Sequence, residues 1–344
     1  MNFGFTEEQN LLRDQVERFM QDTCPMTRVR ELGSAGGFDA ALWKQIGDLG
    51  WLGLLIPEAY GGLGLKWIDQ VVVLEAAATG LCPLPIASHA LASTAVLACA
   101  SDEQKSRWLP LMASGEAICT LGLYDDANWI DPSAIAATAK ANADGYVLSG
   151  TKPFVNDASN ATYLLLAVQG PEGLGLAAVS KDEVRITPQP TMDSTKPMAS
   201  VDLDGVAINA ESLLAMTTEQ LSYLTDCGAL AVTAEMVGAG DSILNLTSDY
   251  AKQRIQFGKP IGQYQGVKHR LADMYVDLES YRSLCYFAGW CADDDPKELA
   301  RAVSLAKGYA SDAFNQIGID GVGLHGAIGF TAEYDAQLFL KRSK

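Results

Sequence analysis

The fold is decided by the stretch Tyr250-Ala-Lys-Gln-Arg-Ile-Gln-Phe-Gly-Lys-Pro-Ile-Gly-Gln-Tyr-Gln-Gly-Val-Lys-His-Arg-Leu-Ala-Asp-Met274. Gly258 and Pro260, in its middle, are typical of a point where one helix ends and another begins. The sequence on either side has the apolar spacing of long helices. The stretch therefore predicts two long helices joined by a short break.

The residues around this break combine a cation, an aromatic ring and an amide. Tyr250, Arg254 and Phe257 follow an i, i+4, i+7 spacing, which places them on one face if the helix continues through them. Gln265 falls in the first turns of the next helix. This set fits a cradle for a phosphate ester. Spacing alone favours a simpler interpretation, an arginine that offsets its helix C-terminus and a phenylalanine in the core.

Helical patterns continue on both sides of the quoted stretch. The first 117 residues open with a capping box from Thr6 to Gln9, and further helices are expected over 38–50, 66–79, 86–99 and 102–113. Towards the C-terminus we expect helices over 217–256, 261–292 and 296–318, then a glycine-rich loop and a short last helix. Both ends of the chain are therefore predicted to be helical.

Between residues 118 and 209 the pattern changes to short apolar runs separated by Gly, Pro, Asn and Asp. Strands are expected over 145–149, 162–168, 174–180 and 200–207. The sequence thus predicts a mainly α protein with a β domain. Its three domains are expected over 1–117, 118–209 and 210–344.

Composition narrows the class of protein. With 344 residues, 48% of them apolar and 19% charged, the chain is long enough for two or three domains with real cores, and widespread disorder is not expected. A net charge of −17 argues against nucleic acid and anionic membrane surfaces. It does not exclude a CoA ester, since a few local Arg and Lys residues can hold an anion on an acidic protein.

Targeting signals and metal motifs are not evident in the sequence. The N-terminus lacks a basic region followed by an apolar core, and the most apolar region, 71–100, is interrupted by Glu75, Pro83, Pro85 and His89. The seven cysteines are scattered and form no CxxC pair. We expect a reduced, cytoplasmic protein with no membrane insertion, and we assign no metal site.

The 250–274 stretch resembles the flavin-contacting motif of acyl-CoA dehydrogenases, in which Arg, Phe-Gly, Pro-Ile and Gln occur in this order. Four other stretches resemble the family in the right order: Phe5–Gln9, Gly50–Gly62, Trp108–Glu116 and Gly323–Phe330. The resemblance implies an N-terminal helical domain, a middle β-barrel or sandwich and a C-terminal four-helix bundle. It also implies FAD as cofactor, an acyl-CoA as substrate, and formation of a double bond between its α and β carbons.

The resemblance implies that this chain does not supply the catalytic base, a glutamate that the family places at one of two positions. One is in a loop after the last short helix, and the chain stops before that loop would begin. The other is ten residues before a glycine matched by Gly238; here it is Gly228, and Ala229 replaces a neighbouring family Arg. Asp226 and Glu235 are out of register, and we expect them to be surface or structural residues.

The flavin-ring pocket also departs from the family pattern. Phe154-Val155-Asn156 replaces an aromatic-x-Thr pair and lacks its hydroxyl. Leu123–Asp131 replaces a segment containing Gly-Ser-Asp, and Asp125 and Asp126 within it are expected to face a phosphate-bearing ligand unfavourably. The resemblance therefore implies a weakened site for a flavin ring of the chain's own.

One part of the family's cofactor site is retained. In family tetramers the Arg/Phe-Gly/Gln motif reaches across an interface to the adenine and pyrophosphate half of the neighbour's FAD. The glycine loop matches only in part, because Gly323 replaces a Gln and Ala327 a Gly; His325 fits either a ligand contact or a structural role. Together the resemblance implies cofactor contacts from Arg254, Gln256, Phe257, Gln265, Leu324, His325 and Gly326.

This combination is similar to the short subunits of heterotetrameric bacterial acyl-CoA dehydrogenases that act on CoA esters of steroid side chains. A longer partner subunit would supply the base and the flavin-ring pocket. Two alternatives stay open: a complete homotetrameric flavoenzyme with an unrecognised base, and a non-enzymatic assembly scaffold. A flavin-dependent hydroxylase on the same fold is a more distant one. Apolar residues along 261–292 lead us to expect a dimer or tetramer.

Overall fold

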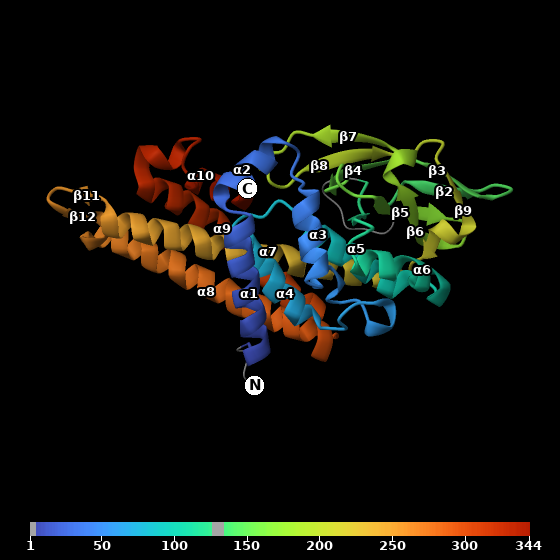
Figure 1. Ribbon diagram of the computed structural model, residues 1–344, viewed down its shortest axis with the longest axis horizontal. Helices are drawn as coiled ribbons and strands as arrows, with labels where there is room; N and C mark the ends of the chain where they lie inside the picture. The colour runs from blue at the N-terminus through green and yellow to red at the C-terminus, as the bar shows by residue number, and fades with distance from the viewer. Residues whose placement is uncertain (1–4, 126–133) are drawn as a thin grey trace. The chain divides into compact units, whose positions relative to one another are not determined.

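A computed structural model describes residues 5–125 and 134–344. The order of elements is helical, then β, then helical, as predicted (Figure 1). The N-terminal helices are α1 (Glu7–Thr23), α2 (Met26–Ser34), α3 (Ala40–Asp48), α4 (Trp67–Ala78), α5 (Ile86–Cys99) and α6 (Asp102–Ala113). The C-terminal helices are α7 (Thr218–Gln253), α8 (Gln265–Asp294), α9 (Leu299–His325) and α10 (Ala336–Ser343). The capping box is confirmed, since the Thr6 hydroxyl accepts from the Gln9 N–H and the Gln9 side chain accepts from the Thr6 N–H.

These elements pack into two compact units. The first contains residues 1–31, 67–82 and 229–344, and the second contains 32–66 and 83–228. The second unit therefore holds the strands from β1 to β10, and the first holds most of the C-terminal helices. The domain boundaries at 117 and 209 stay a prediction.

The second unit is built around two sheets. The larger sheet has the order β10-β6-β5-β2-β3-β9, with β1 paired in parallel to β5, and the smaller has the order β4-β8-β7. The strands are β1 (Cys119–Gly122), β2 (Thr138–Ala141), β3 (Gly145–Ser149), β4 (Thr151–Asn156), β5 (Tyr163–Gly170), β6 (Gly173–Ser180), β7 (Arg185–Gln189), β8 (Met198–Asp202), β9 (Ala207–Asn209) and β10 (Leu213–Ala215).

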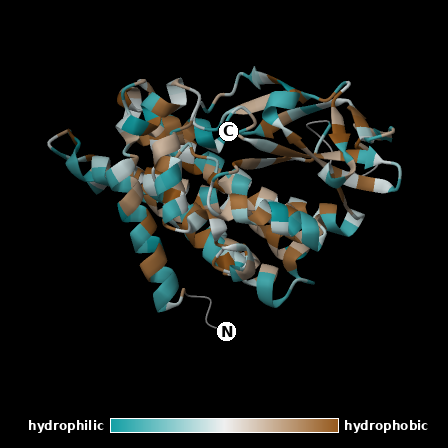
Figure 2. Ribbon diagram, turned by 45° about the vertical axis from the view of Figure 1, so that its right-hand side comes forward, coloured by the Kyte–Doolittle hydropathy of each residue, from teal (hydrophilic) through white to brown (hydrophobic). Residues whose placement is uncertain are grey.

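Strand β5 shows how one sheet serves two cores. Leu165 and Ala167 face a core shared with α5 and α6, whereas Leu164, Leu166 and Val168 face a core shared with β4 and β8. This division follows from the period of two in a strand, where successive side chains point to opposite faces. Figure 2 shows that hydrophobic and hydrophilic residues both occur along the strands.

Two predicted elements differ from the structure. The expected strand over 200–207 is two strands, β8 and β9, because Asp202 and Gly205 form a turn in which the Asp202 carboxylate accepts from the Asp204 N–H. The helix expected to end at 318 continues to His325. Two of its glycines, Gly318 and Gly321, are packing positions within the helix: a Cβ on Gly321 would lie 2.6 Å from the Ile243 side chain.

Within the first unit α7 and α8 run side by side (Figure 1). The Tyr281 hydroxyl of α8 donates to the Met236 carbonyl of α7 at 3.1 Å, and α8 packs along α9. Among the described residues, α7 alone is long and apolar enough to cross a membrane by length and composition, and 61% of its most apolar window is buried inside the protein. That degree of burial is typical of a core helix.

Candidate functional site

The predicted helix break is a β-hairpin at the end of α7. The strands β11 (Ile255–Gln256) and β12 (Lys259–Pro260) pair antiparallel around Phe257 and Gly258, whose φ angles are +51° and +81°. Two central residues with positive φ are typical of a type I′ hairpin turn. Because α7 ends at Gln253, the expectation that Tyr250, Arg254 and Phe257 share one helical face was wrong.

The predicted site residues in and next to the hairpin are exposed to solvent, and backbone hydrogen bonds hold the hairpin together. Phe257 is 94% exposed, and Arg254, Gln256 and Gln265 are exposed as well. The Ile261 N–H donates to the Arg254 carbonyl at 2.8 Å, which closes the base of the hairpin. The turn therefore presents an aromatic ring and several polar groups to the outside on a defined backbone.

Tyr264, which the sequence analysis did not single out, fixes the hairpin against α8. Its hydroxyl donates to the Gln256 carbonyl at 3.0 Å, and the Lys259 ammonium lies 4.4 Å from the centre of its ring. Nothing in the spacing of the quoted stretch predicts this side chain's role. It orders the peptide that carries Gln256 and Phe257.

The start of α8 is an open anion-binding arrangement. Tyr264 occupies the N-cap position of this 30-residue helix and makes no side-chain cap hydrogen bond. Gln265 and Gly266 follow, and a Cβ on Gly266 would have no heavy atom within 4 Å. In the part of the chain that the structure describes, Arg254 has no ion pair. Uncapped N–H groups and an unpaired guanidinium each favour a negatively charged group.

The 324–326 segment, the second predicted part of the site, contacts Tyr250 of α7. The Tyr250 hydroxyl donates to the His325 carbonyl at 3.3 Å, and the two rings lie 4.5 Å apart. Since Arg254 is one turn further along the chain, the hairpin and the 324–326 segment belong to the same end of the first unit.

His325 itself is buried. Its Nδ1 lies 2.6 Å from the Gly321 carbonyl, and its ring packs 4.9 Å from that of Tyr334. Burial lowers the pKa of His325, which keeps the ring neutral. This burial favours a structural role for the imidazole, although its buried Nε2 has no hydrogen-bond partner among the described residues. Leu324 is half-buried and Gly326, with φ +66°, is exposed, so the backbone around Gly326 is the accessible part of this segment.

Gly228, at the family's position for the catalytic base, has free space around its Cα. A Cβ on Gly228 would meet only the Leu91 side chain, at 3.9 Å. Asp226, two residues earlier, is half-buried, and burial raises its pKa. Glu235 is half-buried too, so of the two expected roles, surface or structural, neither carboxylate is a freely exposed surface group.

Phe154 lies at an irregular point of β4 in the second unit. The pairing of β4 with β8 shifts register between Lys152 and Val155, and Phe154 has a φ of +54°. Its N–H donates to the Gln189 side chain at 2.9 Å, and its ring is 50% exposed. A bulge of this kind redirects a side chain, so the aromatic half of the expected pair is displayed.

The structure places the Asp125 carboxylate differently from what the sequence led us to expect. Its carboxylate is only 10% exposed, lies 2.9 Å from the fully buried Lys152 ammonium and accepts from the Ala136 N–H at 2.7 Å. The expectation that Asp125 repels a ligand phosphate was wrong, because its charge is turned inward and paired. The rest of that expectation, Asp126 and the segment to residue 131, lies outside the described residues.

Two parts of the chain match the domains of one known protein family. Residues 6–116 match the acyl-CoA dehydrogenase N-terminal domain and residues 220–344 the acyl-CoA dehydrogenase C-terminal domain. The acyl-CoA dehydrogenase IpdE2 of Mycolicibacterium smegmatis is 30% identical, over 98% of this chain and 93% of its own length.

Two solved structures have the same fold. A chain of the ChsE4-ChsE5 complex from Mycobacterium tuberculosis has a TM-score of 0.92 and 28% identity, covering 100% of this chain and 93% of that one. A chain of the Tcur3481-Tcur3483 steroid ACAD, a G363A variant, has a TM-score of 0.88 and 28% identity, covering 98% of this chain and 92% of that one. With both terminal domains matched and a relative aligned over nearly its whole length, the chain belongs to the acyl-CoA dehydrogenase family of FAD-dependent oxidoreductases that act on the CH–CH bond of acyl-CoA esters.

Proposed function

We propose that this chain is one subunit of a heteromeric acyl-CoA dehydrogenase, and that it completes the FAD site of a longer partner subunit without supplying the catalytic base. The observation that carries the proposal is the α7–α8 hairpin. Arg254, Gln256 and Gln265 are exposed polar groups on an ordered backbone, and an exposed site of this kind suits a ligand that another chain holds.

The groups at the hairpin fit the phosphate half of FAD. The guanidinium of Arg254 offers fixed donors to an anion, the uncapped start of α8 offers N–H groups, and Gly266 leaves room for close approach. Phe257 adds an exposed ring for contact with an aromatic ligand. FAD, when bound, supplies the hydride acceptor, and the residues of this hairpin would bind and orient its phosphates.

The missing base supports a division of labour between two chains. Dehydrogenation of an acyl-CoA needs a carboxylate near the α-carbon, and Gly228 offers none. Asp226 and Glu235 lie on the same helix, two residues before and seven after that position. We assign no catalytic residue to this chain, and the base is expected from the partner subunit.

An extended apolar surface on the first unit is consistent with assembly. Met274 and Leu278, from the predicted apolar set on α8, are buried within the unit, but Tyr275 is exposed. Large hydrophobic side chains exposed on the hairpin and the C-terminal helices are Ile255, Phe257, Tyr275, Val276, Leu305, Tyr309, Ile319, Ile328 and Phe330. Such a concentration is typical of a protein–protein interface.

The substrate we propose is the CoA ester of a steroid side chain, used in the cytoplasm. Support comes from the steroid ACAD among the similar structures. Of the small residues that follow Gly228 on α7, Ala229 is half-buried and suits a roomy pocket, whereas Ala231 is fully buried, as in close helix packing.

One observation favours a second candidate, a complete homotetrameric flavoenzyme. Phe154 is half exposed on a bulge held by Gln189, which is how a ring would be displayed for stacking on a flavin. This candidate predicts that the chain purified alone binds FAD and is reduced on addition of an acyl-CoA. A scaffold would bind no flavin in any assembly.

The test is an FAD titration of the complex reconstituted with its co-expressed partner. Replacing a charged hydrogen-bond partner costs about 1.5–3 kcal/mol, so Arg254→Ala is expected to weaken FAD binding roughly ten- to a hundredfold. Arg18→Ala, on the exposed face of α1, is the matched control and should leave the FAD affinity unchanged. Light scattering checks that assembly is intact. Unchanged FAD affinity in an intact Arg254→Ala complex would refute the proposed role.

A further inference from the structure

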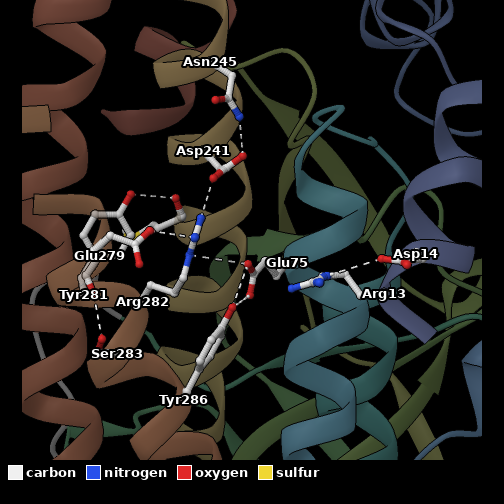
Figure 3. Close-up of polar contacts among 11 residues, drawn as sticks. Arg13, Asp14, Glu75, Asp241, Asn245, Glu279, Tyr281, Arg282, Ser283 and Tyr286 are labelled. Atoms are coloured by element: carbon white, nitrogen blue, oxygen red, sulfur yellow. Dashed lines mark hydrogen bonds and ion pairs between the residues drawn. The ribbon is translucent and has the colours of Figure 1, made fainter. Parts of the chain in front are cut away.

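A buried acidic cluster in the first unit lies outside the candidate site. Figure 3 shows Glu75 of α4 between Tyr286 and Arg282 of α8, with Arg13 of α1 on its other side. Glu75 is only 6% exposed. A carboxylate so far from water is stable only if its charge is well compensated or if it carries a proton.

The two short contacts between Glu75 and Tyr286 need one more proton than the phenol alone supplies. The Tyr286 hydroxyl lies 2.7 Å from Oε2 and 3.0 Å from Oε1 of Glu75. A phenol has one proton and can satisfy only one of these oxygens at a time. A proton on the other carboxyl oxygen would satisfy the second contact, with Glu75 as the donor and the phenol oxygen as the acceptor.

The guanidinium of Arg282, near Glu75, already forms ion pairs with two other carboxylates. Arg282 lies 2.6 Å from Asp241 through one terminal nitrogen and 2.8 Å from Glu279 through the other. Its Nε is 3.8 Å from Glu75 and makes no hydrogen bond. Three carboxylates therefore share one guanidinium, and Glu75, the most buried of the three, has the weakest contact with it.

The charges on the remaining helices do not change this balance. On α1, Arg13 is attracted to Glu75 but is also 3.8 Å from Asp14, and Glu17 adds a carboxyl whose own pKa burial raises. On α8, burial raises the pKa values of Tyr281 and Cys285, so both side chains stay neutral. Asp277 of α8 adds a further negative charge that acts on Tyr281.

The backbone at Glu75 is in tight contact with α7. Gly238 of α7 packs directly on Glu75, and a Cβ at that glycine would lie 1.9 Å from the Glu75 carbonyl oxygen. Because α4 is in such close contact with α7, a charge that appears on Glu75 is not relieved by a small shift of the helix.

We propose that Glu75 is a proton-dependent latch, protonated while α4 is docked on α7 and α8, and that loss of its proton weakens that docking. The proposal uses none of the residues assigned to FAD binding, so it stands or falls independently of the proposed function. Its physical basis is the exchange of a neutral hydrogen-bonded pair for a buried, poorly compensated carboxylate.

The direction of the pH dependence follows from the pKa. Burial raises the pKa of Glu75 to about 7, although the Tyr286 hydrogen bond and the Arg282 charge partly oppose that rise. A folded-state pKa above the unfolded value means that the stabilisation is complete below the unfolded pKa of roughly 4.5 and is lost as the pH rises through about 7. The latch is therefore closed in mild acid and weakened above neutrality.

The test is amide hydrogen exchange of α4 in the full chain, in the assembly in which it purifies. Glu75→Gln keeps the shape and cannot titrate. Between pH 5 and 7 the protection of α4 in the wild type should fall relative to that in Glu75→Gln by about five- to sevenfold per pH unit, roughly fortyfold in total. Asp273→Asn, which removes an exposed carboxylate from α8, should behave like the wild type. A wild-type to Glu75→Gln ratio that does not change with pH would overturn the proposal.

A second variant keeps the test decisive if Glu75→Gln does not fold. The Tyr286 hydrogen bond lowers the Glu75 pKa, so Tyr286→Phe should move the loss of protection to higher pH while keeping a one-proton step. Infrared titration gives a direct measurement, because a protonated carboxyl band should disappear from the wild type near pH 7. The absence of that band at pH 5, or a midpoint that Tyr286→Phe does not raise, would contradict the latch.

Discussion

The ion pair between Lys152 and Asp125 allows a quantitative test of the second unit. Lys152 is fully buried, its ammonium lies 2.9 Å from the Asp125 carboxylate, and burial lowers its pKa. Removing one partner of a buried pair costs about 3–5 kcal/mol, because the other charge is left without compensation. Asp125 keeps its hydrogen bond from the Ala136 N–H at 2.7 Å, so Lys152→Met is expected near the lower end, at about 3 kcal/mol.

The assay is urea denaturation followed by a spectroscopic signal of the second unit. Lys44→Met is the matched control, because Lys44 pairs with Asp48 at 2.7 Å on the surface, with side chains 75% and 64% exposed. An exposed pair of this kind contributes about 0.3–0.5 kcal/mol. The double variant Lys152→Met/Asp125→Asn should recover much of the loss, since it leaves no buried charge. If Lys152→Met costs no more than Lys44→Met, the inward orientation of Asp125 does not stabilise the fold and our correction fails.

Two further predictions concern glycines. Gly228→Glu should fold, because Leu91 is the only described residue within 4 Å of the added Cβ. The variant chain alone should not oxidise an acyl-CoA, because Asn156 still replaces the threonine of the flavin-ring pair. Appreciable turnover without a partner would show that the flavin site was misjudged. Gly238→Ala should destabilise the chain by about 1–3 kcal/mol or more, because its Cβ would overlap the Glu75 carbonyl. Gly323→Ala, with open space around it, should be close to neutral in thermal unfolding. Equal melting temperatures for the two variants would contradict the packing argument.

Most of the fold could be predicted because its signals are local. The capping box at Thr6, the apolar run that forms β5 and the helix over 102–113 each depend on residues close together in sequence, and each is confirmed. The hairpin after α7 could not be placed, because Phe257 adopts a positive φ that a bulky residue rarely takes, and only the pairing of Gln256 with Lys259 explains it.

The candidate site was harder to predict where a side chain's partner is distant in sequence. The sequence placed Asp125 among ligand-facing residues, since nothing near it indicates that Lys152, in another strand, neutralises it. His325 left two roles open, and its packing against Tyr250, 75 residues earlier, favours the structural one. Composition and spacing identify the residue types of a site, but partners that are remote in sequence decide their charge and accessibility.

The two glycines on α7 separate what the fold requires from what the function requires. Gly238 lies against the Glu75 carbonyl, where an added Cβ would approach to 1.9 Å, so packing alone explains why no larger residue stands there. Gly228, ten residues earlier on the same helix, has no such neighbour, and a side chain there would meet only Leu91 at 3.9 Å. Among the described residues the fold therefore leaves room for a Cβ at position 228, so contact with its neighbours does not require a glycine there. Room for a side chain at this position, the absence of a base there and the display of Arg254 on an ordered hairpin together support our proposal of a subunit that shares its chemistry with a partner.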